Sequence, residues 1–299
     1  MVIEDQAAGL RRLVDRQQRD EQFSQIPLNK SRIITVASGK GGVGKSNVTV
    51  NVGLSLARMG KKVLVIDGDM GMANIDILLD LQPRYNLDDI LEGKCTLEQA
   101  IMEGPEELHI LPGISGSDSL LDIDSRQVDQ LLSASSQIED NYDIILIDIG
   151  AGAGRVVVNF VMAADEVLIV LTPEPTSVMD AYSLIKILSR HNLSGEIKLI
   201  LNQVNSRKEA RKLSERMSRV IGDYLDLECN LLDYIPYDSK IKKSVRKQQP
   251  LVKLFPESRA GQAFARIAGK LIGRDLEQQQ SQGMKGFFFK VIGMFNGNN

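Results

Sequence analysis

The chain has 299 residues, of which 43% are apolar, and its formal charge is −3. This length holds one large α/β domain or two smaller ones, and the small net charge gives no overall electrostatic reason for nucleic-acid binding. The two cysteines, Cys95 and Cys229, form no Cys-x-x-Cys pair, which argues against a disulfide framework, a zinc site or an iron–sulfur cluster. The first residues are acidic and polar, and no apolar run approaches the ~20 residues of a membrane span. We therefore expect a cytoplasmic protein that can lie on a membrane.

A glycine-rich stretch follows the first apolar run. Residues 32–37 are rich in β-branched side chains, and a helical periodicity of apolar residues begins near Val48. Between them lies the pattern Gly-x-x-x-x-Gly-Lys-Ser, which in this context predicts a phosphate-binding loop rather than an incidental turn. Its N–H groups attract phosphate, Lys45 reaches the terminal phosphates, and the Ser46 hydroxyl can ligate Mg²⁺. The predicted nucleotide-binding residues of the loop are Gly39, Lys40, Gly41, Gly42, Val43, Gly44, Lys45, Ser46 and Asn47.

A second lysine, Lys40, precedes the paired glycines and is not needed by an ordinary phosphate loop. With it, residues 40–46 resemble the deviant Walker A loop of the MinD/ParA class of P-loop ATPases. The resemblance implies a slow, regulatory ATPase that forms an ATP-dependent homodimer, in which Lys40 reaches the nucleotide of the partner subunit. A cation there stabilises the charge that spreads over the phosphate oxygens during transfer. The alternative is a solvated loop lysine.

Two further apolar runs end in aspartate. Residues 62–66 lead to Asp67 and Asp69, and residues 142–147 lead to Asp148. Ligands of open parallel sheets bind at the carboxyl ends of the strands, so we expect these carboxylates near the phosphate loop rather than acting only as turn formers. Asp148 fits a Walker B aspartate that holds the Mg²⁺ water shell. Similarity to MinD assigns the orientation of the attacking water to Asp69, with Asp67 supporting the loop and the metal shell. The expected metal residues are Ser46, Asp67 and Asp148, and the expected catalytic residues are Lys40, Lys45 and Asp69.

Four more positions complete the predicted nucleotide site. Gly152, in the loop after Asp148, offers an N–H that can sense the γ-phosphate. Asn202 ends a strand-type run, and its amide can read an adenine edge with a donor and an acceptor, a role that the family resemblance also gives it. Pro236 and Asp238 follow the next run and, by the same resemblance, close over the base. Both patterns are also found in ordinary turns.

The apolar runs also predict the fold. Seven runs of strand type, which begin near residues 33, 63, 108, 144, 167, 197 and 231, alternate with helix-type segments. This alternation predicts an α/β fold with a mostly parallel, twisted sheet of about seven or eight strands and helices on both faces. The resemblance to MinD-like P-loop ATPases runs from residue 32 to 273. The expected parts are an arm at 1–28, the ATPase domain at 29–275, a linker at 276–283 and a terminal helix at 284–297.

The arm is unlike the rest of the chain. Residues 1–28 are rich in Gln, Arg and Asp, and composition alone favours a disordered polar tail. Its pattern Asp-Gln-Ala-x-x-Leu-Arg, however, resembles the N-terminal activator motif of the FlhG (YlxH/FleN) family, which controls flagellar number. In that family the segment stimulates FlhF, a GTPase of the signal-recognition-particle class, and Gln6 would reach the active site of that partner. The expected contact residues are Asp5, Gln6, Ala7, Leu10 and Arg11.

The last segment has apolar side chains at helical spacing. They are Met284, Phe287, Phe288, Val291, Ile292 and Phe295. Two lysines flank this face and a polar linker precedes it, which favours a helix that lies on an anionic membrane surface over an ordinary helix docked in the core. One copy would bind marginally, because the interface buries its side chains only in part. Two copies joined in an ATP-dependent dimer would bind better, so ATP would place the protein on the inner face of the cell membrane.

The sequence thus predicts a dimerising ATPase switch that controls flagellar number and placement, with flagellar switch (C-ring) proteins as further candidate partners. A MinD-type division-site ATPase and a ParA-like DNA-segregation ATPase are the alternatives. The second would need DNA binding by the basic segments 206–220 and 240–247. We interpret these segments as solvated helical faces, so DNA is not an expected partner.

Overall fold

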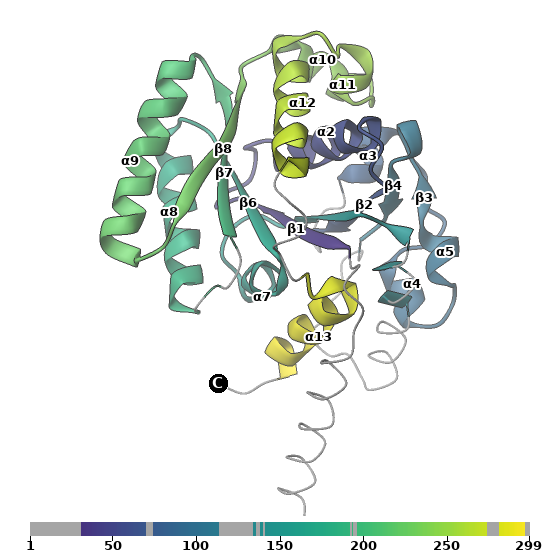
Figure 1. The fold of residues 1–299 in the computed structure, drawn as a ribbon. Helices are drawn as coiled ribbons and strands as arrows, with labels where there is room; N and C mark the ends of the chain where they lie inside the picture. The colour runs from purple at the N-terminus through teal and green to yellow at the C-terminus, as the bar shows by residue number, and fades with distance from the viewer. Residues whose placement is uncertain are drawn as a thin grey trace, which may run out of the picture.

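The computed structural model describes residues 31–69, 74–113, 134–135, 138–139, 141–191, 193, 196–273 and 281–296. In these ranges the strands form one eight-stranded sheet that lies between two layers of helices (Figure 1). In spatial order the strands are β3 (Met102–Glu103), β4 (His109–Leu111), β2 (Val63–Gly68), β5 (Ile144–Ile149), β1 (Arg32–Ala37), β6 (Glu166–Leu171), β7 (Glu196–Val204) and β8 (Cys229–Pro236). All neighbouring strands are parallel except β3 and β4. The predicted α/β fold is confirmed.

The seven predicted strands are the seven parallel strands of the sheet. Strand β3 was not predicted, because its two residues are too short for a pattern of alternating side chains to emerge. It pairs with β4 at the edge of the sheet, where Met102 lies opposite Ile110. The sheet therefore has the predicted number of strands, about seven or eight, and one of its edges is an antiparallel pair.

Helices follow most of the strands. They are α2 (Lys45–Arg58), α3 (Ile75–Leu79), α4 (Leu87–Leu91), α5 (Leu97–Ala100), α7 (Arg155–Ala163), α8 (Pro175–Arg190), α9 (Arg207–Leu225), α10 (Ser239–Arg246), α11 (Leu251–Leu254), α12 (Arg259–Ile272) and α13 (Gly283–Asn296), with a 3₁₀ turn at Pro105–Glu107. The chain crosses from one parallel strand to the next through these helices, as parallel pairing requires, except between β4 and β5, where most of the connection lies outside the described residues.

The sheet has an apolar core on each face. In β5, Ile145 and Ile147 point into one core and Ile144 and Leu146 into the other, because successive side chains of a strand alternate between faces. Helices α4, α5, α7, α8, α9 and α13 cover the first face, and α2, α3, α11 and α12 cover the second. Burial on both faces explains why the strands read as continuous apolar runs.

The strand order also determines where a site can form. Strand β5 lies between β2 and β1, so the carboxyl ends of these three strands are neighbours at one edge of the sheet. Asp67 of β2 stands directly opposite Asp148 of β5 in the strand register. Residues that are 81 positions apart in the chain are thereby brought to one place, next to the loop that follows β1.

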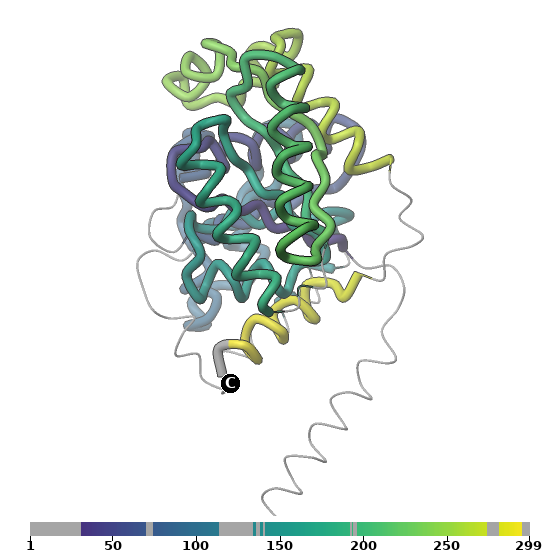
Figure 2. The backbone as a smooth tube through the Cα atoms, turned by 90° about the vertical axis from the view of Figure 1, so that its left-hand side faces the viewer, coloured from purple at the N-terminus to yellow at the C-terminus, as the bar shows by residue number. Residues whose placement is uncertain are grey.

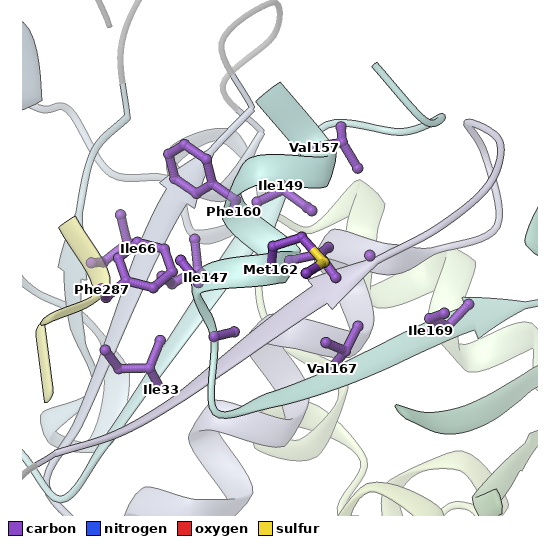
Figure 3. Close-up of a cluster of buried hydrophobic side chains, with 14 of the residues drawn as sticks. Ile33, Ile66, Ile147, Ile149, Val157, Phe160, Met162, Val167, Ile169 and Phe287 are labelled. Carbon is purple, nitrogen blue, oxygen red and sulfur yellow. The ribbon is translucent and has the colours of Figure 1, made fainter. Parts of the chain in front are cut away.

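The C-terminal helix α13 packs against the body of the protein. Its apolar face is buried among side chains of α7 and the sheet, and Phe287 is only 1% exposed. The Phe287 ring meets the Phe160 ring edge to face, with 5.6 Å between the ring centroids. Figure 3 draws Phe287 among Phe160, Ile66 and Ile147. Of the six predicted apolar residues, Met284, Phe287, Phe288, Val291 and Ile292 are buried here, and the side chain of Phe295 lies outside the described residues.

Polar contacts hold both ends of α13. Just before the helix, the Ser281 hydroxyl lies 2.8 Å from a carboxylate oxygen of Asp165, and the Gln282 N–H donates to the other oxygen at 3.4 Å. Near the far end, the guanidinium of Arg155 donates to the carbonyl of Met294 at 3.2 Å. Arg155 is the first residue of α7, so the helix that follows the β5 loop also holds the end of α13.

We expect the Phe287→Ala substitution to release α13 before it unfolds the sheet. Removal of a buried Phe side chain costs about 3–5 kcal/mol, and a terminal helix can detach instead of leaving a cavity. Hydrogen exchange of residues 281–296 should therefore accelerate while exchange in β1 and β5 is unchanged.

The control for this experiment is Gly293→Ala. Gly293 is an exposed position of the same helix, and a Cβ there meets no atom within 4 Å. Alanine favours a helix over glycine by about 1 kcal/mol, so protection of α13 should be kept or increased. Equal acceleration in both variants would contradict the role of Phe287 as the main apolar contact.

Candidate functional site

The loop between β1 and α2 has the backbone of a phosphate-binding loop. Gly42 and Gly44 have φ values of 79° and 90°, a left-handed region that residues with a Cβ rarely adopt. Gly44 is the N-cap of α2, and no side chain caps the helix there. The first N–H groups of α2 are therefore available to an anion, which the helix dipole also favours.

Gly39 allows this loop to lie against α8. A Cβ at this position would come within 2.2 Å of the carbonyl carbon of Asp180. Only glycine lets the two backbones approach so closely. The loop is thus held from outside by a helix that lies more than a hundred residues later in the sequence.

We expect Gly39→Ala to displace the loop. The added methyl group cannot be accommodated by a side-chain movement, because backbone atoms of Asp180 and Ala181 surround it. Overpacking of this kind costs about 1–3 kcal/mol, which should appear as a lower free energy of unfolding together with weaker ATP binding. Gly41→Ala is the matched control for the free energy of unfolding, since a Cβ at Gly41 meets nothing within 4 Å. Equal stability of the two variants would contradict this account.

Lys45 is already paired at the strand edge. Its Nζ lies 2.9 Å from Oδ1 of Asp148, and both side chains are buried. The Thr49 hydroxyl lies 2.9 Å from the same carboxylate oxygen. The second oxygen, Oδ2 of Asp148, is buried and has no hydrogen-bond partner among the described residues. A buried carboxylate oxygen in this state is a suitable ligand for a cation or for its water shell.

Thr49 was not predicted as a site residue. It lies four positions after Lys45 in α2, so the two side chains share one face of the helix. That spacing is the signal that could have identified it, because any residue one turn after the loop lysine points toward the same strand end. Its contact with Asp148 fixes the carboxylate beside Lys45.

Asp67 organises the chain that follows β2. Its Oδ1 accepts the N–H of Asp69 at 3.1 Å, and its Oδ2 accepts the N–H groups of Asn74 at 3.0 Å and Ile75 at 3.2 Å. Burial first, and then the charge of Asp148, raise the pKa of Asp67 to about 6. The position of Asp67 beside Asp148 gives the site an excess of negative charge, which a divalent cation would offset.

Asp69 and Gly152 lie close to the same edge. A Cβ placed on Gly150 would be 3.4 Å from Oδ1 of Asp69, so this carboxylate faces the loop after β5. In that loop the Gly152 N–H donates to the Ser38 carbonyl at 2.9 Å. The N–H that was predicted to sense the γ-phosphate therefore ties the β5 loop to the end of β1 in this structure.

Lys40 contacts α8 rather than the Lys45–Asp148 pair. Its Nζ lies 3.3 Å from Oε2 of Glu174 and 3.1 Å from the Thr176 hydroxyl. The side chain is about one-third exposed, and Glu174 is more exposed still. Neither contact residue was predicted. They precede and open α8, and only the folding of α8 against the loop brings them to Lys40.

The predicted adenine residues have structural partners here. The Asn202 amide nitrogen donates to the Val43 carbonyl at 2.8 Å, and its oxygen accepts the Gln203 N–H at 2.9 Å. Asn202 thus reaches the phosphate loop, as expected for a strand-end residue. Asp238 caps α10 through the Lys240 N–H at 2.9 Å, and Pro236 ends β8. Their roles toward a base stay predictions.

These features together define the nucleotide site of a P-loop ATPase. A family model described as "AAA domain" matches residues 31–203. Antiactivator FleN of Pseudomonas aeruginosa is 41% identical over 240 residues, which cover 80% of this chain and 86% of FleN. Flagellum site-determining protein YlxH of Helicobacter pylori is 35% identical over 268 residues, 88% of this chain and 90% of YlxH.

A solved structure agrees with the fold. The septum site-determining protein MinD of Pyrococcus horikoshii, complexed with Mg-ADP, is 30% identical, with a TM-score of 0.66 over 84% of this chain and 99% of that one. The chain therefore belongs to the FlhG group, with FleN and YlxH, of the MinD/ParA-type ATPases. The prediction of an ATPase from this group is confirmed.

Neither the described residues nor the comparisons with known proteins bear on some of the predicted features. The arm at 1–28, with Asp5, Gln6, Ala7, Leu10 and Arg11, lies outside the described residues, as does most of the linker at 276–283. The domain boundaries also stay predictions. In the described part of the chain, no helix is long and apolar enough to cross a membrane.

Proposed function

We propose that this ATPase is a dimerising switch that controls the number and placement of flagella. The observation that carries the proposal is the position of Lys40, which is bonded to α8 while Lys45 occupies the Asp148 carboxylate of its own site. This contact holds Lys40 apart from the Lys45–Asp148 pair, and because it is exposed, Lys40 can exchange it for the phosphates of a second copy at little cost. The similarity to FleN and YlxH supports a flagellar role.

Mg²⁺ is the metal that fits this site. The buried and unpartnered Oδ2 of Asp148 supplies a hard oxygen ligand, and Ser46 stands in the first turn of α2. Asp67 would support the water shell through its position opposite Asp148. When bound, the ion would neutralise charge on the phosphate oxygens. The solved MinD with Mg-ADP supports this choice of metal and nucleotide.

In the proposed reaction, the residues of the chain bind and orient. The amides of the loop and Lys45 hold the β- and γ-phosphates, for which Lys45 has to give up part of its contact with Asp148. Asp69 orients the attacking water from its place beside the β5 loop. Lys40 of a second copy reaches the phosphates and stabilises the charge that develops on them. Hydrolysis removes the group that both copies contact, so the dimer separates.

The N-terminal arm would be the output of the switch toward an FlhF-type GTPase. A peptide of residues 1–28 should stimulate GTP hydrolysis by an FlhF-type protein, because a side-chain amide such as that of Gln6 can orient an attacking water. A Gln6→Ala peptide is the control and should stimulate far less. Absence of stimulation by the native peptide would remove the main support for this output.

Helix α13 would be the output toward the membrane. Five of its apolar residues are buried against the protein, so α13 has to leave this position before it can bind lipid. Each of these side chains gains ~1.5–3 kcal/mol when buried, whether in the protein or in part in a lipid interface. The exchange between the two positions thus depends on a small difference in free energy. Two copies of the helix, linked in an ATP-dependent dimer, would shift this difference toward the membrane.

The membrane output is tested by co-sedimentation of the full chain with vesicles that contain anionic lipid. We expect more protein on the vesicles with ATP than with ADP, and little on vesicles of neutral lipid, since the lysines of the helix favour anionic headgroups. Equal sedimentation with both nucleotides would exclude an ATP-dependent membrane switch.

A second candidate function is the selection of the division site, which the similarity to a MinD structure favours. A membrane helix would serve both functions, so the vesicle experiment does not separate them. The arm peptide does, because a division-site ATPase has no expected use for an FlhF activator. Stimulation of the GTPase favours the flagellar function.

A further inference from the structure

One surface of the molecule has a strong local charge that the nucleotide site does not use. Helix α10 and the residue after it carry five exposed cations, Lys240, Lys242, Lys243, Arg246 and Lys247. None of the five forms an ion pair with an acidic residue in the described part of the chain. The nearest acid in sequence, Asp238, is occupied as the cap of α10. We call this region, with the apolar residues described next, the α10 surface.

Exposed apolar side chains lie among these cations. The described residues include six exposed large apolar side chains, and three of them, Ile77, Tyr237 and Val245, belong to the α10 surface. Ile77 is 59% exposed and Val245 is 40% exposed. Gln248 joins the two, because its side-chain amide donates to the Ile77 carbonyl at 3.0 Å and its N–H donates to the Val245 carbonyl at 3.0 Å. Helix α3 and the end of α10 are therefore side by side.

The combination of cations and exposed apolar side chains on the α10 surface indicates what kind of partner would fit. Phosphate groups would pair with the cations but would gain no binding free energy from the exposed Ile77 and Val245. A protein helix with an apolar stripe and acidic flanks would bind both the cations and the apolar side chains. In this structure α10 and α13 lie at opposite ends of the molecule in both views (Figures 1 and 2), so the docked helix α13 leaves the α10 surface uncovered. They also belong to opposite faces of the sheet: Ile241 of α10 packs into one core and α13 into the other.

We propose that the α10 surface binds an acidic, amphipathic helical segment of a partner protein. The apolar side of the segment packs on Ile77 and Val245, and its carboxylates pair with the lysines of α10. This interaction goes beyond the proposed switch function and does not depend on it, because neither the nucleotide residues nor the N-terminal arm takes part.

The test uses the full chain and a labelled helical peptide with Leu at i, i+3, i+4 and i+7 and Glu at most other positions. Binding is measured by fluorescence anisotropy without nucleotide. We expect the double variant Lys242→Glu/Lys243→Glu to weaken binding at least tenfold, and Ile77→Ala to weaken it about threefold. The matched control is Lys212→Glu/Arg216→Glu, which makes the same change of charge on the exposed face of α9 and should bind as the native chain does. Unchanged ATP turnover verifies that each variant is folded.

Three results would overturn the proposal. Equal weakening by the α9 and α10 variants would mean that only net charge matters. Tighter binding of duplex DNA than of the peptide, lost in the α10 variant, would make the surface a nucleic-acid site. Loss of ATP-dependent dimer formation in the α10 and Ile77 variants, with no binding of the peptide to the native chain, would show that a second copy covers this surface.

Discussion

Replacement of Asp69 by Asn should slow ATP turnover by about 10²- to 10⁴-fold, which is the usual contribution of a positioned group that orients or deprotonates a nucleophile. The Asp69 carboxylate lies beside Gly150, in reach of the loop that follows the Walker B strand. An amide has nearly the same shape as the carboxylate, but it is neutral and its nitrogen only donates hydrogen bonds. The amide therefore cannot take a proton from water as the carboxylate does. ATP should still bind, because the loop and Lys45 are unchanged.

Turnover and binding are measured separately to test this result. Single-turnover hydrolysis gives the rate, and equilibrium binding of a fluorescent ATP analogue gives the affinity. Asp80→Asn is a suitable control, since Asp80 is an exposed aspartate at the end of α3 and should leave both quantities unchanged. A rate within a factor of three of the native rate would exclude Asp69 from the orientation of water.

Replacement of Lys40 by Ala should abolish the ATP-dependent dimer and lower turnover by about 10³- to 10⁵-fold, as removal of a cation supplied in trans does in related phosphoryl transfers. The stability of the monomer should hardly change, because the pair that Lys40 makes with Glu174 is exposed and such pairs contribute less than about 1 kcal/mol. The defect should thus lie in assembly rather than in folding.

The oligomeric state is followed by light scattering with ATP and with ADP. Glu174→Gln is the informative companion variant, because it removes the contact in which Lys40 is held but leaves Lys40 itself. This variant should dimerise at least as well as the native chain. A Lys40→Ala protein that dimerises normally with ATP would contradict the role in trans, and so would a native dimer that forms equally without nucleotide.

Some long-range contacts show why the sequence could not predict the whole site. Lys198 lies inside an apolar strand and is almost fully buried, where it pairs with Glu166 of β6, which also pairs with Arg32 of β1. Three strands that are distant in the sequence supply this network. A strand pattern predicts that each strand is buried, but it contains no information on which strand lies beside it.

The sequence by itself determined the features that are local in the chain. The phosphate loop between Gly39 and Ser46, the aspartates at the ends of two strands and the amphipathic terminal helix were all predictable, because glycine conformations, strand ends and helical spacing depend on residues that are close in sequence. The alternation of strands and helices likewise predicted the parallel sheet.

Only the tertiary structure decided what these local features contact. It showed that Asp148 pairs with Lys45, that Glu174 pairs with Lys40 and that the apolar face of α13 packs on α7. An apolar face has to be buried, yet burial is non-directional and is satisfied equally well by a membrane, a second copy or the protein's own core. The choice among them depends on the strand order and on the packing of α7 against the sheet, which arise only when the whole chain is folded.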